Sequence, residues 1–447
     1  MSRPARIARQ SRRRVSATAV LALAGTLGLA ACGAGADVAG AGVECDVDLP
    51  QETTVVNLLS YTSPATDPFA DAIVNGCTTG TLRVDAPETD FAGQNQRAVQ
   101  SMSSANPSYD LIEVYGTVYP LYAERGWIAP LDDLIADRGD DLGLDDIDPA
   151  LLESLSYNGQ QVGIPTFWGP IILVYREDVF TDLGLEVPTT FEEMFAAAET
   201  IRAETDMANP LALPMATAGG VATVYNQLLG SLGGHWFEDG AAVPTLDSPE
   251  SVAALEALRD TYGNMSSESI SWASPEVVTQ LQTGQAAMSM LFAGRVSALL
   301  EERQTEHFDD FAFAVPPAVV EGGTPATSLS VDGLAIASNS AVDEDLLFDL
   351  IAVATGPEAA EAASAVTIPA RTAQAQAAEL PFEPAAREVL ESERPNGLPL
   401  VPWMSDVFAV AAPILNEVLS GTVEPADAAV QLQAAAEQAI AQAGFAP

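Results

Sequence analysis

The chain has 447 residues, 48% of them hydrophobic, and carries 62 acidic against 18 basic side chains, for a formal net charge of −44. This length exceeds one typical core, so two lobes are expected, and the hydrophobic content favours packed globular structure over disorder. The charge excludes a basic patch for nucleic acid or anionic membranes. It indicates either a solvated, salt-adapted surface or an acidic site for a cationic ligand.

The first 48 residues predict export and anchoring. Residues 1–14 are basic, residues 15–29 are small and apolar, and Leu-Ala-Ala-Cys follows at 29–32, which is the layout of a secretory signal peptide. The last four residues resemble a bacterial lipobox, in which Cys32 would receive lipid and become the new N-terminus; the alternative is an ordinary signal peptide. We therefore expect a signal peptide at 1–31 and a tether at 32–48. The export route, general or twin-arginine, stays open.

Two further cysteines remain once Cys32 is assigned to lipid. Cys45 and Cys77 would then lie in an oxidising compartment, where a disulfide between them is expected and two buried free thiols are the alternative.

The segment after the tether alternates between strand and helix patterns. Strands are predicted at 53–61, 82–85 and 109–114, with helices at 67–75 and 91–104 between them. Such alternation indicates a parallel sheet with covering helices, whose ligands bind beyond the C-terminal ends of the strands. This rule brings several polar and aromatic residues to one edge: Tyr61, Ser63, Glu88, Tyr115 and Thr117.

Residues 163–193 combine an aromatic bend, a strand and a capped helix. The apolar run 171–175 predicts a short buried strand, and Trp168-Gly169-Pro170 before it predicts an accessible bend. Thr189 or Thr190 would cap a helix that begins at Phe191. Aromatic residues on a bend ahead of a buried strand suggest a crossing between lobes, where a ligand would bind.

The rest of the chain is mostly helical. Strands are predicted at 311–315 and 329–337, and helices at 191–202, 223–232, 249–262, 275–281, 295–303, 343–355, 406–419 and 426–441.

Several segments resemble the signatures of one family. They are residues 123–131 (AERGWIAPL), residues 163–193 from Gly163-Ile164-Pro165 through Phe191-Glu192-Glu193, residues 281–290 (LQTGQAAMSM) and residues 368–371 (IPAR). Their order over residues 50–440 resembles the bacterial extracellular solute-binding proteins of the maltose-binding type, the capture subunits of ABC importers for sugars and polyols. Leu281 replaces the usual Phe, and Phe292 stands where the family commonly carries a stacking Trp.

The resemblance implies a type II periplasmic-binding-protein fold, α/β and two-lobed, with a mostly parallel sheet and covering helices in each lobe. Lobe 1 would comprise 49–168 and 317–372, and lobe 2 would comprise 169–316 and 373–447, with hinge crossings near 166–170, 316–326 and 368–372. The expected protein is a monomeric, lipid-anchored, extracytoplasmic lipoprotein that captures a sugar or polyol and delivers it to the permease of an ABC importer.

The candidate ligand site lies between the lobes. It comprises Tyr61, Ser63, Tyr115, Trp168, Trp236, Phe292, Asp332, Arg371 and Trp403. A polyhydroxylated ligand needs flat aromatic walls and a few planar polar groups. We expect Trp168 and Trp403 to form the walls, and Asp332 and Arg371 to bind the hydroxyls. Ordinary packing is the alternative for each.

The sequence carries no recognisable catalytic motif. His235 and His307 lack a second ligand at metal spacing, and the chain has no nucleophile elbow, phosphate loop or dinucleotide fingerprint. We therefore expect no enzyme, no metal and no cofactor. An anchored glycoside hydrolase and a binding protein for a cation such as a polyamine remain alternatives.

Overall fold

A computed structural model describes residues 43–104, 107–238, 241–392 and 397–445. The predicted signal peptide, Cys32 and most of the tether lie outside these residues. In the described part of the chain, no helix has the length and apolar character needed to cross a membrane.

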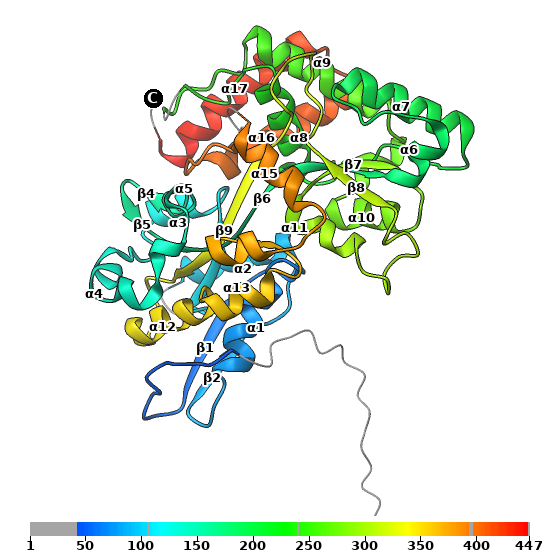
Figure 1. Ribbon diagram of the computed structural model, residues 1–447. Coiled ribbons are helices and arrows are strands. Elements are labelled where there is room, and N and C mark those ends of the chain that lie inside the picture. Colours follow the sequence, from blue (N-terminus) through cyan, green and yellow to red (C-terminus); the bar gives the residue numbers. More distant parts are fainter. Residues whose placement is uncertain (1–42, 105–106, 239–240, 393–396, 446–447) are drawn as a thin grey trace, which may run out of the picture. The chain divides into compact units, whose positions relative to one another are not determined.

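The first three strands form a parallel core, as predicted. β1 (Thr54–Leu59) pairs in parallel with β2 (Leu82–Asp85) on one side and with β3 (Leu111–Tyr115) on the other. The connections are α1 (Asp67–Gly76) and α2 (Phe91–Met102), and the Asp90 side chain caps α2 by accepting from the Gly93 N–H. The ends of β1 and β3 therefore lie at one edge of the sheet (Figure 1).

The remaining strands join antiparallel. The order in the large sheet is β10-β6-β9-β3-β1-β2, with β7 and β8 also paired to β6. The bounds are β6 (Ile164–Arg176), β7 (Met288–Phe292), β8 (Phe311–Ala314), β9 (Leu329–Ile336) and β10 (Ile368–Pro369), and β4 (Ser156–Tyr157) with β5 (Gln160–Gln161) forms a separate hairpin. The sheet is thus mixed, which strand and helix alternation alone does not indicate.

The predicted bend at residues 168–170 is wrong, because β6 runs through it as one strand of 13 buried residues. Gly169 meets a close neighbour there, since an added Cβ would lie 3.1 Å from the Ala293 Cβ. The first half of β6 pairs with β9 and β10, and the second half pairs with β7 and β8. The chain therefore crosses between the lobes along a continuous strand.

Helices from two distant parts of the chain build the second lobe (Figure 1). They are α6 (Glu177–Leu183), α7 (Phe191–Glu204), α8 (Ala218–Ser231), α9 (Pro249–Gly263), α10 (Ser274–Gln282), α16 (Met404–Leu419) and α17 (Pro425–Ala443). Thr190 is the N-cap of α7: its hydroxyl accepts from the Glu193 N–H, and the Glu193 carboxylate accepts from the Thr190 N–H. The predicted helix 295–303 is shorter, ending as α11 (Ala293–Val296) and a 3-10 turn that buries Val296 and Leu299.

Helices also cover the first lobe and the junction. α3 (Tyr119–Glu124), α4 (Asp132–Leu142) and α5 (Pro149–Glu153) follow β3, while α12 (Glu344–Ala354), α13 (Pro357–Ala363) and α14 (Thr372–Ala377) follow β9. α15 (Glu383–Glu391) packs near β8, with the Phe382 and Phe313 rings 5.8 Å apart.

Residues 317–328, expected in lobe 1, contact helices of the second lobe. The Ser231 hydroxyl donates to the Thr324 carbonyl at 2.6 Å, and the Asn226 amide donates to the Ser328 hydroxyl at 2.9 Å. Ala318 accepts from the Phe191 N–H at the start of α7. The chain therefore returns to the first lobe along β9, later than the expected boundary.

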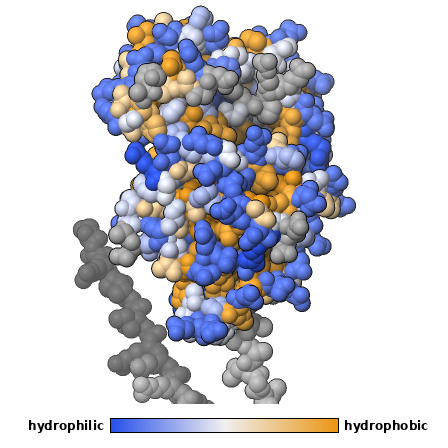
Figure 2. All heavy atoms as spheres, turned by 90° about the vertical axis from the view of Figure 1, so that its left-hand side faces the viewer, coloured by the Kyte–Doolittle hydropathy of each residue, from blue (hydrophilic) through white to orange (hydrophobic). Residues whose placement is uncertain are grey.

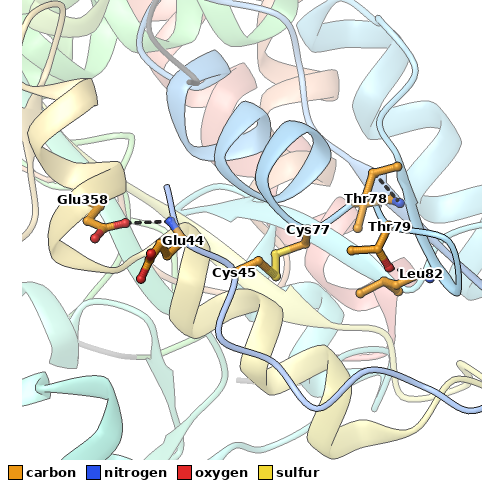
Figure 3. Close-up of a disulfide and its surroundings, with 8 residues drawn as sticks. Glu44, Cys45, Cys77, Thr78, Thr79, Leu82 and Glu358 are labelled. Atoms are coloured by element: carbon orange, nitrogen blue, oxygen red, sulfur yellow. Dashed lines mark hydrogen bonds between the residues drawn. A yellow bond between two sulfur atoms is a disulfide. The ribbon is translucent and has the colours of Figure 1, made fainter. Parts of the chain in front are cut away.

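The N-terminal end of the described chain is fixed to the first lobe. A disulfide joins Cys45 to Cys77 at the end of α1, and the Glu44 N–H donates to the Glu358 carboxylate of α13 at 2.8 Å (Figure 3). Val43 packs against a small cluster that includes Phe69. Residues 43–45 of the predicted tether are therefore held in place.

The surface is mostly hydrophilic on the face shown in Figure 2, with hydrophobic residues gathered in patches between the polar ones. The abundance of carboxylates is consistent with such a solvated surface.

Candidate ligand-binding site

Three aromatic rings meet beyond the ends of β1, β2 and β3. Phe91 stacks on Tyr115 with ring centroids 4.8 Å apart and meets Tyr61 edge-on at 5.3 Å. Tyr61 and Tyr115 are buried, whereas Phe91 is 43% exposed. Phe91 therefore presents an apolar face to solvent at the mouth of the group, where a ligand could stack.

Asp332 lies directly beside these rings. It is opposite Tyr115 in the β3–β9 pairing, its side chain accepts from the Tyr61 hydroxyl at 2.9 Å, and it also accepts from the Ser330 hydroxyl at 2.7 Å. Burial raises the pKa of Asp332 from 3.8 to about 6, although the bonds from Ser330 and Tyr61 and the charge of Arg295 act in the opposite direction. This buried carboxylate could accept hydrogen bonds from ligand hydroxyls or bind a cation.

Glu113 places a second buried carboxyl group behind the first. It accepts from the Tyr61 N–H at 3.0 Å, and burial, then the charge of Asp332, raises its pKa well above the usual range. Glu113 also lines a cavity of about 10 Å³ together with Thr66 and Thr166. That volume suits one water molecule at most. We call Tyr61, Phe91, Tyr115, Glu113 and Asp332 the aromatic–carboxylate site.

Arg295 approaches this site from the second lobe. It follows β7 in α11, and its guanidinium carbon lies 5.1 Å from the centroid of the Tyr61 ring. Its charge lowers the pKa of Tyr61, Glu113 and Asp332, against the larger effect of burial. The site is therefore built by both lobes.

Ser63 adjoins the aromatic–carboxylate site along the chain, and Trp168 adjoins it across the β6–β9 pairing. Ser63 is buried in the turn after Tyr61, and its hydroxyl is 3.2 Å from that of Thr66. Trp168 is buried in β6 opposite Val331, the neighbour of Asp332. Both positions adjoin the site by backbone pairing or sequence.

The other four predicted site residues are held by contacts of their own. Trp236 is buried in the core of the second lobe and donates to the Asn226 amide oxygen at 3.0 Å. Phe292 pairs with Ile171 at the end of β7. Arg371 is 3% exposed and donates to the carbonyls of Thr355, Gly143 and Leu142, so its guanidinium is used within the first lobe.

Trp403 is the fourth of these residues. Its ring packs against Phe237 at 5.9 Å and Phe445 at 5.1 Å, before α16. Its buried indole N–H has no hydrogen-bond partner among the described residues. Ser405, two residues further along, reaches the first lobe, because its hydroxyl donates to the Thr117 carbonyl at 3.0 Å. Trp403 therefore lies near a contact between the lobes, and its indole N–H can donate to a ligand.

Sequence reasoning missed Phe91, Glu113, Ser330 and Arg295. Phe91 follows the predicted edge residue Glu88, so the strand-end rule could have found it. Arg295 follows Phe292-Ala293-Gly294, and no local signal indicates that it reaches the other lobe. The described residues hold no group of three or more His, Cys, Asp or Glu side chains that could bind a metal ion.

Residues 84–361 match the family model described as bacterial extracellular solute-binding protein. The chain is 30% identical over 198 residues to the diacetylchitobiose binding protein DasA of Streptomyces coelicolor, covering 44% of each chain. It is 23% identical over 257 residues to a probable amino-acid ABC transporter periplasmic-binding protein of Sinorhizobium fredii, covering 54% of this chain and 57% of that one. The chain thus spans about half the length of these curated relatives.

Among solved structures, the chain resembles an ABC transporter solute binding protein from Agrobacterium radiobacter K84 in complex with ribitol. The TM-score is 0.77 at 20% identity, with 87% of this chain and 99% of that chain covered. This likeness confirms the predicted two-lobed α/β fold.

Proposed function

Because the chain belongs to the bacterial extracellular solute-binding protein family, we propose that it is the substrate-binding subunit of an ABC importer that captures a carbohydrate or polyol between its lobes and delivers it to the permease. The observation that carries this proposal is the aromatic–carboxylate site, where an exposed ring adjoins buried hydrogen-bond acceptors. Aromatic faces suit the C–H faces of a sugar or polyol, and carboxylates accept from its hydroxyls. The protein releases its ligand unchanged and acts as a monomer.

The ligand class is supported by the relatives. DasA is named for diacetylchitobiose, and the Agrobacterium radiobacter structure contains ribitol. Titration calorimetry with ribitol, mannitol and chitobiose tests the proposal directly. A micromolar affinity would correspond to about −8 kcal/mol, and no heat with any sugar or polyol would contradict the proposal.

Phe91 gives the sharpest test of the site's location. The change Phe91→Ala removes a ring that is 43% exposed, so the fold should persist while affinity falls by about 1–2 kcal/mol. Val99→Ala is the matched control, because Val99 lies on the same helix and is 41% exposed away from the three rings. Equal affinities of both variants would move the site elsewhere.

Trp168 and Trp403 remain proposed walls of the ligand site. The free indole N–H of Trp403 supports a hydrogen bond to a ligand, although the ring also packs in the core. We expect Trp403→Phe, which keeps most of the packing, to weaken ligand binding by about tenfold, which is about 1.4 kcal/mol. An unchanged affinity would assign Trp403 to packing alone.

A cationic ligand such as a polyamine is the second candidate. Two buried carboxyl groups beside three aromatic rings favour it, since cations are attracted to both. Putrescine and spermidine in the same calorimetric series separate the two candidates.

The protein acts outside the cytoplasm, and we propose a lipid anchor at Cys32. Changing Cys32→Ser should release it from membranes into the medium, because no described helix is long and apolar enough to replace the anchor. Unchanged fractionation with membranes would contradict the anchor and leave the ligand proposal intact.

A further inference from the structure

The aromatic–carboxylate site has the chemistry of a cation site. Asp332 and Glu113 are buried, and the Tyr61 hydroxyl donates to Asp332 at 2.9 Å. Asp67 adds a third carboxyl group whose charge acts on Glu113. Buried carboxylates without a nearby cation are costly, and aromatic faces attract positive charge. Some positive charge is therefore expected beside Tyr61 and Asp332.

Arg295 supplies this charge from within the chain. Its guanidinium lies over the Tyr61 ring, 5.1 Å from the centroid, in the position that a cationic ligand would take. No hydrogen bond or ion pair joins the guanidinium to another residue in the described ranges. A guanidinium has five N–H donors in a fixed fork, so these donors can serve a bound ligand.

The fold brings Arg295 to this position through tight backbone contacts. Arg295 follows Gly294, where an added Cβ would lie 3.0 Å from the Ala65 Cβ of the loop after β1. Gly169 of β6 packs equally closely on Ala293, at 3.1 Å for an added Cβ. Both glycines let α11 approach the first lobe closely, so the side chain of Arg295 reaches Tyr61.

We propose that Arg295 determines the ligand specificity of the site: its guanidinium occupies the cation position beside Tyr61 and Asp332, and its N–H groups donate to ligand hydroxyls. The site therefore accepts neutral polyhydroxylated ligands and rejects cations. This inference rests on the proposed function and names the residue that selects between its two candidate ligand classes.

Truncating Arg295 should reverse the selectivity. In Arg295→Ala the carboxyl groups keep their positions, but the nearby positive charge that lowers their pKa is gone and a guanidinium-sized space opens over Tyr61. Free guanidinium or ethylguanidinium should then bind there, and polyols should lose the donors that Arg295 provided. Arg295→Gln removes the charge while keeping a similar length and an N–H₂ donor.

The test measures binding of ethylguanidinium, putrescine and ribitol to the wild-type protein, Arg295→Ala, Arg295→Gln and the control Arg303→Ala. Arg303 is an exposed arginine eight positions along the chain, so it controls for the change in net charge. Calorimetry gives affinities, and thermal unfolding at millimolar, non-denaturing concentrations gives a second readout. We expect ethylguanidinium to bind Arg295→Ala and Arg295→Gln at least about tenfold more tightly than the other two proteins.

The outcomes separate this inference from the proposed function. If ribitol or another polyol binds the wild type but neither Arg295 variant gains affinity for cations, the inference is overturned and the proposed function stands. If no polyol binds but both variants gain affinity for ethylguanidinium, the inference that Arg295 excludes cations is supported, and the proposal of a carbohydrate or polyol ligand is contradicted. Putrescine binding to the wild type would overturn this inference and favour the cationic candidate over the polyol. If Arg295→Ala fails to fold, Arg295→Gln alone decides.

Discussion

The hydrogen bond from Tyr61 to Asp332 should make stability depend on pH in a specific way. Tyr61→Phe removes the hydroxyl that lies 2.9 Å from the buried carboxylate, while the volume of the side chain changes little. A hydrogen bond to a charged group contributes about 1.5–3 kcal/mol, and a neutral one about 0.5–1.5 kcal/mol. The loss should therefore be about 2 kcal/mol where Asp332 is ionised and about 1 kcal/mol where it is protonated.

The pKa of Asp332 fixes the pH at which the loss changes. Burial raises this pKa from 3.8 to about 6, so ionisation of Asp332 lowers the stability of the folded protein as the pH rises through about 6. The bond from Tyr61 stabilises the ionised form and limits that decrease. Without it the folded pKa rises further, and the variant should fall behind the wild type mainly above pH 6.

Urea unfolding of ligand-free protein at pH 5 and pH 8 measures both effects. Tyr119→Phe is the matched control, because the Tyr119 hydroxyl donates to the Ser156 carbonyl at 3.3 Å, an acceptor that does not titrate. The control should lose a similar amount of unfolding free energy at both pH values. An equal loss at pH 5 and pH 8 for Tyr61→Phe would refute the coupling to Asp332.

Three further changes test features of the fold. Gly294→Ala should destabilise the protein by about 1 kcal/mol or more in thermal unfolding, because overpacking against Ala65 outweighs the gain in helix propensity. The control Gly219→Ala in α8 should instead stabilise the protein, because an added Cβ meets no other atom there. Arg371→Met should lower the unfolding free energy by about 3 kcal/mol in urea, since it leaves three carbonyls without their donor, and a change below about 1 kcal/mol would contradict this role. Replacing Cys45 and Cys77 by Ala should cost about 2–4 kcal/mol and abolish the effect of reductant on the urea midpoint, whereas a reductant effect that persists would count against the disulfide.

Local patterns predicted much of the fold. Leu82–Asp85 is the strand expected from its alternation, and Thr190 caps α7 through the reciprocal bonds that its spacing to Glu193 indicates. These features depend on neighbours within a few residues, so the sequence carries the information directly. The prediction of a bend at Trp168-Gly169-Pro170 was wrong for the opposite reason. Gly169 allows close packing against Ala293, more than a hundred residues along the chain, so its neighbours in sequence do not reveal its role.

The candidate site was predicted in part, and again local patterns were informative where long-range contacts could not be foreseen. The strand-end rule brought Tyr61 and Tyr115 together, and Asp332, which was expected to bind ligand hydroxyls, does contact the Tyr61 hydroxyl. Arg371 was expected to bind ligand hydroxyls, yet its donors bind backbone carbonyls of the first lobe. Arg295 could not be found, because its position depends on the way the second lobe approaches the first.

The disulfide at Cys45 would also limit the length of free chain between a lipid at Cys32 and the folded protein. With lipid at Cys32, the chain from Cys32 to Val43, where the fixed segment begins, can reach about 40 Å at most. If that segment came loose, the free stretch would extend to Thr54 at the start of β1 and reach about 75 Å. With such an anchor, the crosslink would roughly halve the radius of the volume that the protein can explore around the lipid. It would also direct the pull of such an anchor to the first lobe, where Cys77 follows α1, and not to the second lobe.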